Sequence, residues 1–111
     1  MKLFVDDKRT PIDFDDWVIV RTPKQAMSEL DIAVNNDEVI EQVSYDYDMG
    51  ESTIRSLLMW QAKNKVWPLK ASVHSSNGQG RKWLEFVLKN IGGDVEVVAA
   101  PEFLGEATVT T

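Results

Sequence analysis

Short apolar runs alternate along the chain with segments of helical periodicity. A continuous apolar run that ends on charged or small polar residues is typical of a buried strand. The pattern predicts five strands, at residues 2–6, 17–21, 39–46, 69–74 and 95–99. Between the later strands, apolar residues recur at spacings of three and four, which predicts amphipathic helices.

The ends of these helices carry recognisable signals. Thr22-Pro23 offers an N-cap followed by a proline at the first helical position, where no N–H donor is needed. Ser52 or Thr53 is expected to cap the second helix, and Gly92-Gly93 to stop the third. The inward faces are predicted to carry Ala26, Met27, Leu30 and Ala33, then Ile54, Leu57, Leu58 and Ala62, and finally Trp83, Val87, Leu88 and Ile91.

Strands separated by helices imply parallel β-α-β crossovers and an α/β three-layer sandwich. Residues 8–16 are the exception, because Pro11 and three aspartates make a full crossover helix improbable there. A loop or a single helical turn is expected instead. The 111 residues suffice for one modest core, so residues 1–111 are expected to form a single domain.

Composition narrows the functional classes. The net charge of −6, from 18 acidic and 12 basic residues, argues against a basic surface that wraps duplex nucleic acid. The chain has no cysteine, which excludes disulfides and thiolate metal sites. No apolar stretch approaches the ~20 residues of a membrane span, and Met1-Lys2 leads directly into a strand. We therefore expect a cytoplasmic protein that does not associate with membranes.

Carboxylates follow two of the predicted strands. Asp6 and Asp7 end the first, and Asp46 and Asp48 follow the third. The carboxyl edge of a parallel sheet is where open α/β folds bind ligands. Carboxylates gathered there favour a hard cation, so Asp6, Asp7 and Asp46 are candidate ligands of Mg²⁺ or Mn²⁺. Asp48 is expected to join the site or to bind a coordinated water, and the alternative is that all four are ordinary loop carboxylates.

A third candidate segment, His74 to Gly80, follows the fourth strand. It is small and polar and opens a helix, whose N–H groups and dipole favour an anion. His74 can act as a general acid or base, or can be a core histidine. Ser75 and Asn77 can hold phosphate oxygens, or can serve as a helix cap and a turn residue. Gly80 is included among the candidate ligand-binding positions of this segment.

Three cations lie near these motifs in the sequence: Lys8, Arg9 and Arg81. Arg9 is the strongest candidate for phosphate binding, because a guanidinium group binds oxyanions in a bidentate manner. Arg81 is the second candidate. The alternative for each is a solvated surface charge.

These motifs resemble the receiver fold. Receivers place an acidic pair after the first strand, where Asp6-Asp7 lies, and a phosphoacceptor aspartate after the third, where Asp46 lies. Ser75 falls on the receiver hydroxyl position. Ala100-Pro101 falls on the Lys-Pro position, so the receiver lysine is missing, which counts against ordinary phosphorelay signalling.

The chain resembles more closely a short receiver offshoot, the cyclic-phosphate processing receiver domain. The resemblance lies in the Asp6–Pro11 segment, in Trp17 with Arg21-Thr22, in Asp46–Gly50 and in Val73–Gly80. Tyr47 stands where that family commonly has histidine. The resemblance implies a receiver (flavodoxin-like) topology with a mostly parallel five-stranded sheet and a shortened or missing first crossover helix.

The leading functional hypothesis is a metal-dependent phosphoesterase that processes cyclic phosphates. Asp46, Asp48 and His74 would be its catalytic residues, and Arg9, Ser75, Asn77, Gly80 and Arg81 would bind the substrate. The expected ligand is a small phosphorylated molecule or an RNA end, such as a 2′,3′-cyclic phosphate. The alternative is a non-catalytic receiver-like module that binds a phosphorylated ligand or a protein.

Overall fold

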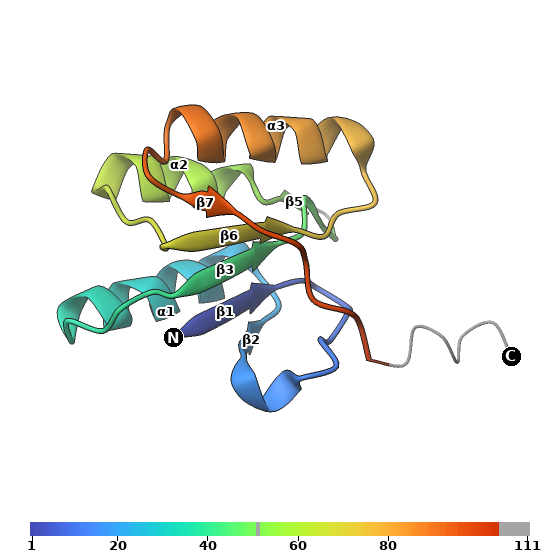
Figure 1. Cartoon of the computed structure of the whole chain (residues 1–111), viewed down its shortest axis with the longest axis horizontal. Helices are drawn as coiled ribbons and strands as arrows, with labels where there is room; N and C mark the ends of the chain where they lie inside the picture. The colour runs from blue at the N-terminus through green and yellow to red at the C-terminus, as the bar shows by residue number, and fades with distance from the viewer. Residues whose placement is uncertain (51, 105–111) are drawn as a thin grey trace, which may run out of the picture.

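Five strands form one parallel sheet in the computed structural model, in which residues 1–50 and 52–104 are described (Figure 1). The strands are β1 (Lys2–Val5), β2 (Val18–Val20), β3 (Gln42–Tyr45), β6 (Lys70–Val73) and β7 (Glu96–Val97). Their spatial order is β2-β1-β3-β6-β7, with parallel pairing throughout. This is the flavodoxin-like order, so the α/β fold class and the receiver topology are confirmed.

Three helices pack beside the sheet: α1 (Pro23–Asn35), α2 (Arg55–Asn64) and α3 (Gly78–Asn90). Each contributes to one hydrophobic core, which also contains Leu3, Val43 and Ala71 of the central strands. The crossovers carrying these helices all run in the same direction along the sheet, from β2 towards β7. Right-handed crossovers in one direction place their helices on one face of the sheet.

The strand register gives the opposite face a different character. Phe4, Ser44 and Ser72 are aligned across β1, β3 and β6, one residue out of step with the core positions. Because alternate residues of a strand point to opposite faces, these three lie away from the helical core. Ser44 and Ser72 are nevertheless fully buried.

The third layer, which covers this opposite face, has no α-helix in the described ranges. The link between β1 and β2 contains only the 3₁₀ turn η1 (Phe14–Asp16), as the sequence predicted. The chain after β7 returns past the sheet (Figure 1) and places Phe103 edge-on to Phe4 at 6.1 Å between ring centroids. Trp17, which follows η1, packs edge-on to Phe4 with 5.8 Å between ring centroids. Aromatic side chains from non-helical segments therefore make this layer.

Some predicted helix details are wrong. Thr22 caps α1 as expected, with its hydroxyl accepting the Gln25 N–H at 3.1 Å. Ser52 and Thr53 do not cap α2, because they form β5 (Ser52–Thr53), which pairs with β4 (Asp48–Met49) in a small antiparallel ladder. Ile91 is 53% exposed, because α3 ends one residue earlier, and the fully buried Leu84 completes the inward face.

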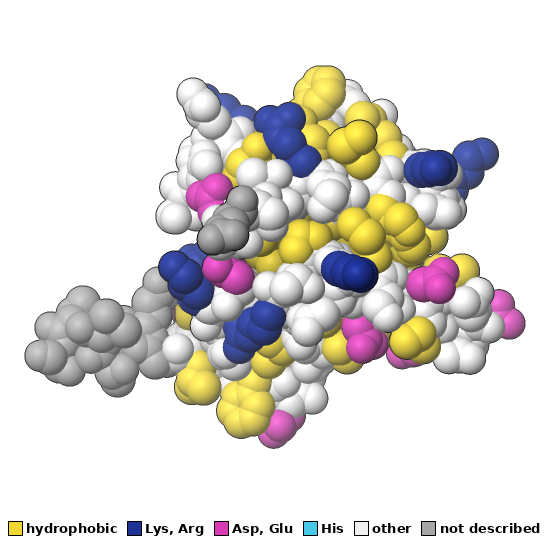
Figure 2. Space-filling model, turned by 180° about the vertical axis from the view of Figure 1, so that it is seen from behind, with side chains coloured by type: hydrophobic (Ala, Val, Ile, Leu, Met, Phe, Trp, Pro, Cys, Tyr) yellow, Lys and Arg dark blue, Asp and Glu magenta, His cyan; other side chains and the backbone are white. Residues whose placement is uncertain are grey.

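Among the described residues, no helix is long and apolar enough to cross a membrane. Figure 2 shows acidic and basic side chains interspersed on the face turned away from the viewer in Figure 1. That view shows no broad basic patch.

Candidate metal centre at the carboxyl edge of the sheet

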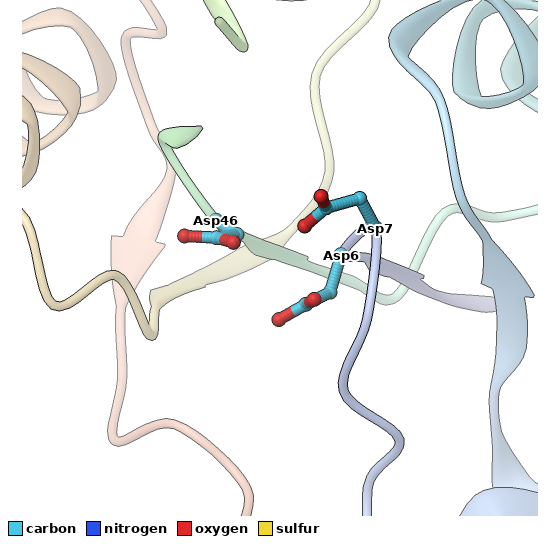
Figure 3. Close-up of side chains that lie close together, drawn as sticks. All are labelled: Asp6, Asp7 and Asp46. Atoms are coloured by element: carbon cyan, nitrogen blue, oxygen red, sulfur yellow. The ribbon is translucent and has the colours of Figure 1, made fainter. Parts of the chain in front are cut away.

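Three carboxylates meet where β1 and β3 end. Asp6 and Asp7 follow β1, and Asp46 follows the adjacent β3 (Figure 3). One ligand atom from each residue can be chosen so that all three lie within 4.8 Å of one another. The sequence predicted this grouping, because the carboxyl ends of neighbouring parallel strands lie at the same edge of the sheet.

The cluster opens onto a pocket of about 330 Å³. Its lining combines acidic, basic and small polar groups: Asp6, Asp7, Lys8, Arg9, Asp46, Asp48, Gly50 and Ser76. Pockets of roughly 300–1,000 Å³ hold small ligands. This pocket lies at the lower end of that range.

Asp6 is the most tightly held of the three. Its Oδ1 accepts the backbone N–H groups of Lys8 and Arg9, both at 2.8 Å. Its Oδ2 accepts Arg9 Nε at 2.8 Å and His74 Nε2 at 3.1 Å. Burial by itself would raise the pKa of Asp6, but these hydrogen bonds and the charge of Arg9 hold that pKa well below its usual range. Asp6 is therefore ionised at every physiological pH.

Asp46 has the opposite electrostatic setting. Burial raises the pKa of its carboxyl group, and the nearby charge of Asp6 raises it further. Arg9, His74 and Ser75 oppose that shift without cancelling it. Two buried carboxylates with opposite pKa shifts are what like charges confined to one site produce. A divalent cation among them would remove this repulsion, and three carboxylate oxygens suit a hard cation, so the donor set fits Mg²⁺ or Mn²⁺.

Arg9 lies between the two buried aspartates. Its Nε contacts Asp6 at 2.8 Å, and its Nη2 lies 3.4 Å from Asp46 Oδ1. The guanidinium group also lies over the ring of Phe103, 4.4 Å from the centroid. The sequence has Ala100 at the position compared above with the receiver lysine, and Arg9 supplies a cation beside Asp46.

Arg21 fixes the loop that carries Arg9. Its Nη1 donates to the backbone carbonyls of Asp6 at 3.2 Å and Arg9 at 2.5 Å, and its Nη2 donates to Thr10 Oγ1 at 2.9 Å. A planar guanidinium group can make several such bonds at once, which suits it to this bridging role. The loop after β1 is therefore held at both ends of the Asp6–Thr10 segment.

His74 lies beneath the pocket rather than in its lining. Its side chain is 1% exposed, and its ring stacks on Phe4 with 4.5 Å between centroids. Both ring nitrogens have partners, Nδ1 with Ser44 at 2.7 Å and Nε2 with Asp6. Of the two sequence-based alternatives, the core histidine matches this placement, with the addition of a direct contact to a candidate ligand.

The residues that open α3 cap the helix. Asn77 is the N-cap, with Oδ1 accepting the Gly80 N–H at 2.9 Å, so the interpretation of Ser75 or Ser76 as the cap is wrong. Ser75 is buried and accepts the Asn77 N–H at 3.1 Å. The Asn77 amide donates to the exposed Asp48 carboxylate at 3.3 Å, which places Asp48 at the rim of the pocket.

Gly80 and Arg81 do not line the pocket. Gly80 is buried against the ring of Tyr47, and a Cβ added to it would lie 2.3 Å from Tyr47 Cγ. Arg81 donates through Nη2 to the Ser75 carbonyl at 2.6 Å. Both residues thus support the loop between β6 and α3, and their predicted contact with a substrate stays a prediction.

Tyr47 points away from the carboxylates. Its ring packs edge-on to Trp83 at 6.0 Å, and its hydroxyl accepts Arg55 Nε at 2.5 Å. The side chain belongs to the core on the helical side of the sheet. Tyr47 therefore contributes no ligand to the Asp6–Asp7–Asp46 cluster.

Sequence reasoning missed several residues that shape the site. Ser44 contacts His74 and Ser72 contacts Ser44, while the ring of Phe103 packs against the Arg9 guanidinium group. Arg21 donates to the Arg9 carbonyl, and Ser76 lines the pocket. The serines had a usable signal, because each lies between two apolar residues of its strand at the same register position. Phe103 had none, since it follows the last strand in a segment without periodicity.

Comparison with known proteins agrees with this arrangement. The family model described as "Cyclic-phosphate processing Receiver domain" matches residues 1–90. No significant match was found among curated proteins or among solved structures. The matched segment contains all three carboxylates, Arg9 and the whole of α3. The chain belongs to the family of cyclic-phosphate processing receiver domains.

Proposed function

We propose that this domain is a metal-dependent phosphoesterase that opens cyclic phosphates. The observation that carries the proposal is the group of three carboxylates within 4.8 Å at the floor of a small open pocket. Membership of a family linked to cyclic-phosphate processing supports the substrate class. The cations of the same pocket, Lys8 and Arg9, suit an anionic ligand.

Asp6, Asp7 and Asp46 would hold the cation, Mg²⁺ or Mn²⁺. Such an ion, when bound, neutralises phosphoryl charge and makes a bound water more acidic. Asp6 contributes a carboxylate that is always ionised, because its hydrogen bonds lower its pKa. Asp7 is half-buried and faces the same space, so it can complete the set without a large rearrangement.

The remaining pocket residues would bind and orient the phosphate. Arg9 is part-exposed, with 29% of its side chain accessible, so its guanidinium group can turn from Asp46 towards phosphate oxygens. Ser76 also lines the pocket and offers a hydroxyl. Asp48, which accepts a hydrogen bond from Asn77 at the rim, would accept a proton from an attacking water.

Ring opening consumes one water. A bond forms between the water oxygen and phosphorus, one ester P–O bond of the ring breaks, and the released alkoxide takes a proton. Asp46 can instead attack phosphorus itself, since carboxylates serve as phosphoryl acceptors, and water then hydrolyses the aspartyl phosphate. Both routes leave a phosphomonoester and a free hydroxyl.

The openness of the site suggests which cyclic phosphate fits. A 2′,3′-cyclic phosphate lies at the end of a nucleotide or an RNA strand, so its phosphate can enter while the base or the strand stays outside. A pocket of about 330 Å³ accommodates this end group. A pocket of this size would not contact the base, so we expect no selectivity for its identity.

A binding module without turnover is the second candidate. It is favoured by the placement of His74, the chain's one histidine, whose ring nitrogens are both engaged and whose side chain is buried. A general acid or base needs reach to the reacting atoms. If Asp48 does not move protons, the site binds a phosphate without cleaving it.

The test is ³¹P NMR of the pure protein with Mg²⁺ or Mn²⁺ and a panel of cyclic phosphates. The panel holds 2′,3′-cyclic nucleotides, 3′,5′-cyclic nucleotides and an oligonucleotide with a cyclic phosphate end. We expect metal-dependent conversion of the 2′,3′-cyclic resonance into that of a monoester.

Two variants make the result interpretable. Asp46→Asn should abolish the conversion. Asp37→Asn, a matched control on an exposed residue with φ of 54°, should leave it unchanged, since asparagine tolerates that backbone conformation. Line broadening in Mg²⁺ that requires the protein, without conversion, would support the binding module, and spectra unchanged by the protein would reject both functions.

A further inference from the structure

We propose that His74 is a positioning residue that holds the Asp6 carboxylate in its ligating orientation through a buried chain of hydrogen bonds crossing the sheet. This inference rests on the proposed metal site and adds a role for residues outside the pocket. It replaces the general acid or base expected from sequence by a group that acts through Asp6.

The chain of hydrogen bonds runs from the carboxyl edge of the sheet towards its amino edge. Asp6 Oδ2 lies 3.1 Å from His74 Nε2, and His74 Nδ1 lies 2.7 Å from Ser44 Oγ. Ser72 Oγ lies 2.7 Å from Ser44 Oγ, and Gln42 Nε2 lies 3.2 Å from Ser72 Oγ. All but Asp6 and His74 lie within β3 and β6, so the sheet itself sets their spacing.

The donors and acceptors of this chain follow a single direction. An ionised carboxylate only accepts, so Nε2 of His74 must carry the proton that faces Asp6. The Gln42 amide donates to Ser72, and the Ser72 hydroxyl donates to Ser44. The Ser44 hydroxyl still has its own proton and can donate it to Nδ1 of His74. With Ser44 as that donor, the proton of the imidazole ring lies on Nε2, facing Asp6.

Burial makes this arrangement rigid. Ser44 and Ser72 have no exposed surface, and the His74 ring is enclosed by Phe4 and by Phe103, whose centroid lies 5.4 Å away. A buried polar group that loses its partner costs roughly 1–3 kcal/mol. No buried side-chain nitrogen or oxygen among the described residues lacks a partner. Rotation of the ring would break two bonds at once.

Asp6 needs such a fixed partner because its other side-chain partner is more accessible. Arg9 has 29% of its side chain exposed, against 1% for His74. When Arg9 turns to a phosphate, the two backbone N–H groups still hold Oδ1 of Asp6 and His74 alone holds Oδ2. Partners of this kind orient metal ligands, and removing them costs roughly 10–100-fold in metal affinity.

The first test is a long-range ¹H–¹⁵N spectrum of the imidazole ring at neutral pH. One histidine in the chain means that every ring signal belongs to His74. We expect the pattern of the Nε2–H tautomer in wild type. A Nδ1–H tautomer, or an exchanging mixture of the two, would overturn the proposed direction of the chain.

The second test is the affinity for Mn²⁺ alone, measured from the EPR signal of the free ion. His74→Phe keeps the aromatic packing but loses both hydrogen bonds, and should weaken Mn²⁺ binding roughly 10–100-fold. His74→Gln places an amide N–H where Nε2 lies, and should return the affinity to within a few-fold of wild type. Ser28→Ala, which removes an exposed hydroxyl on α1 outside this chain of hydrogen bonds, is the control and should bind like wild type.

The outcomes separate the two proposals. Equal affinity of wild type and His74→Phe would overturn the positioning role while leaving the metal site standing. Loss of affinity in both His74→Phe and His74→Gln, with thermal melts showing both folded, would also overturn it, because the restored donor would have had no effect. If wild type itself fails to bind Mn²⁺, the proposed function fails, and the positioning role with it.

Discussion

Replacing Gly80 by alanine tests how the loop beneath the site is supported. An added Cβ would lie 2.3, 2.5 and 2.8 Å from Cγ, Cδ1 and Cβ of Tyr47, far inside van der Waals contact. The ring cannot retreat easily, because Trp83 packs against it and Arg55 donates to its hydroxyl. Overpacking of this kind costs typically about 1–3 kcal/mol.

The helix preference of alanine works in the opposite direction. Alanine stabilises a helical position by roughly 0.5–1 kcal/mol relative to glycine. Because the added Cβ would overlap three atoms of the Tyr47 side chain, which its neighbours hold in place, we place the steric cost in the upper part of this range. Gly80→Ala should therefore lower the free energy of unfolding by about 1–2 kcal/mol, which corresponds to a melting temperature lower by roughly 5–10 °C.

Urea unfolding followed by tryptophan fluorescence measures this change. Gly78→Ala is the matched control, since nothing lies within 4 Å of its Cβ position, and it should leave stability unchanged or slightly raised. In a Tyr47→Ala background most of the cost of Gly80→Ala should be lost, because the two closest contacts, with Cγ and Cδ1, are gone and only the contact with Cβ at 2.8 Å remains. A Gly80→Ala protein as stable as wild type, or a cost that persists in full without the tyrosine ring, would refute the packing argument.

The remaining predictions concern charge at the site. Burial and the charge of Asp6 raise the pKa of Asp46, so folding disfavours its ionised form. Asp46→Asn should therefore stabilise the metal-free protein at neutral pH by about 0.5–2 kcal/mol, and this gain should vanish in acid. Urea titrations at several pH values would contradict this if the gain were absent or grew as the pH fell. Because folding lowers the pKa of Asp6, its ionised carboxylate stabilises the fold above the pKa of the unfolded chain, 3.8, and this contribution is lost as the pH falls below that value. Asp6→Asn should therefore make stability less dependent on pH below about pH 4. An unchanged pH dependence in this variant would count against the hydrogen bonds of Asp6. Arg9→Ala should strengthen Mn²⁺ binding several-fold and weaken the binding of inorganic phosphate, because the guanidinium group competes with a cation and attracts an anion. Calorimetry that finds the two affinities changing in the same direction would refute this.

The sheet and the acidic cluster were predictable because both depend on periodicity. Apolar runs marked the strands, and the carboxylates that end adjacent parallel strands meet at one edge whatever the loops do, as Asp6 and Asp46 demonstrate. The short link with η1 was also predictable, because Pro11 and the neighbouring aspartates oppose a long helix.

Side-chain destinations beyond the strand ends were not predictable in the same way. Loop residues have no period, so the sequence could not show that Tyr47 turns to the helical core, or that Asn77 rather than Ser75 caps α3. The β4–β5 ladder was missed because strands of two residues leave no pattern. The His74 ring packs against Phe103, which lies far from it in the sequence, so local sequence patterns could not predict this contact.

The central claim is that Asp6, Asp7 and Asp46 form one site for a divalent cation. The most direct measurement is a ¹H–¹⁵N NMR titration with Mn²⁺, whose unpaired electrons broaden the amide signals nearest to it. The account predicts saturable broadening centred on the amides of these three residues, and its loss in Asp46→Asn. Broadening centred elsewhere, such as on the exposed aspartates of residues 13–16, or no broadening at all, would contradict it.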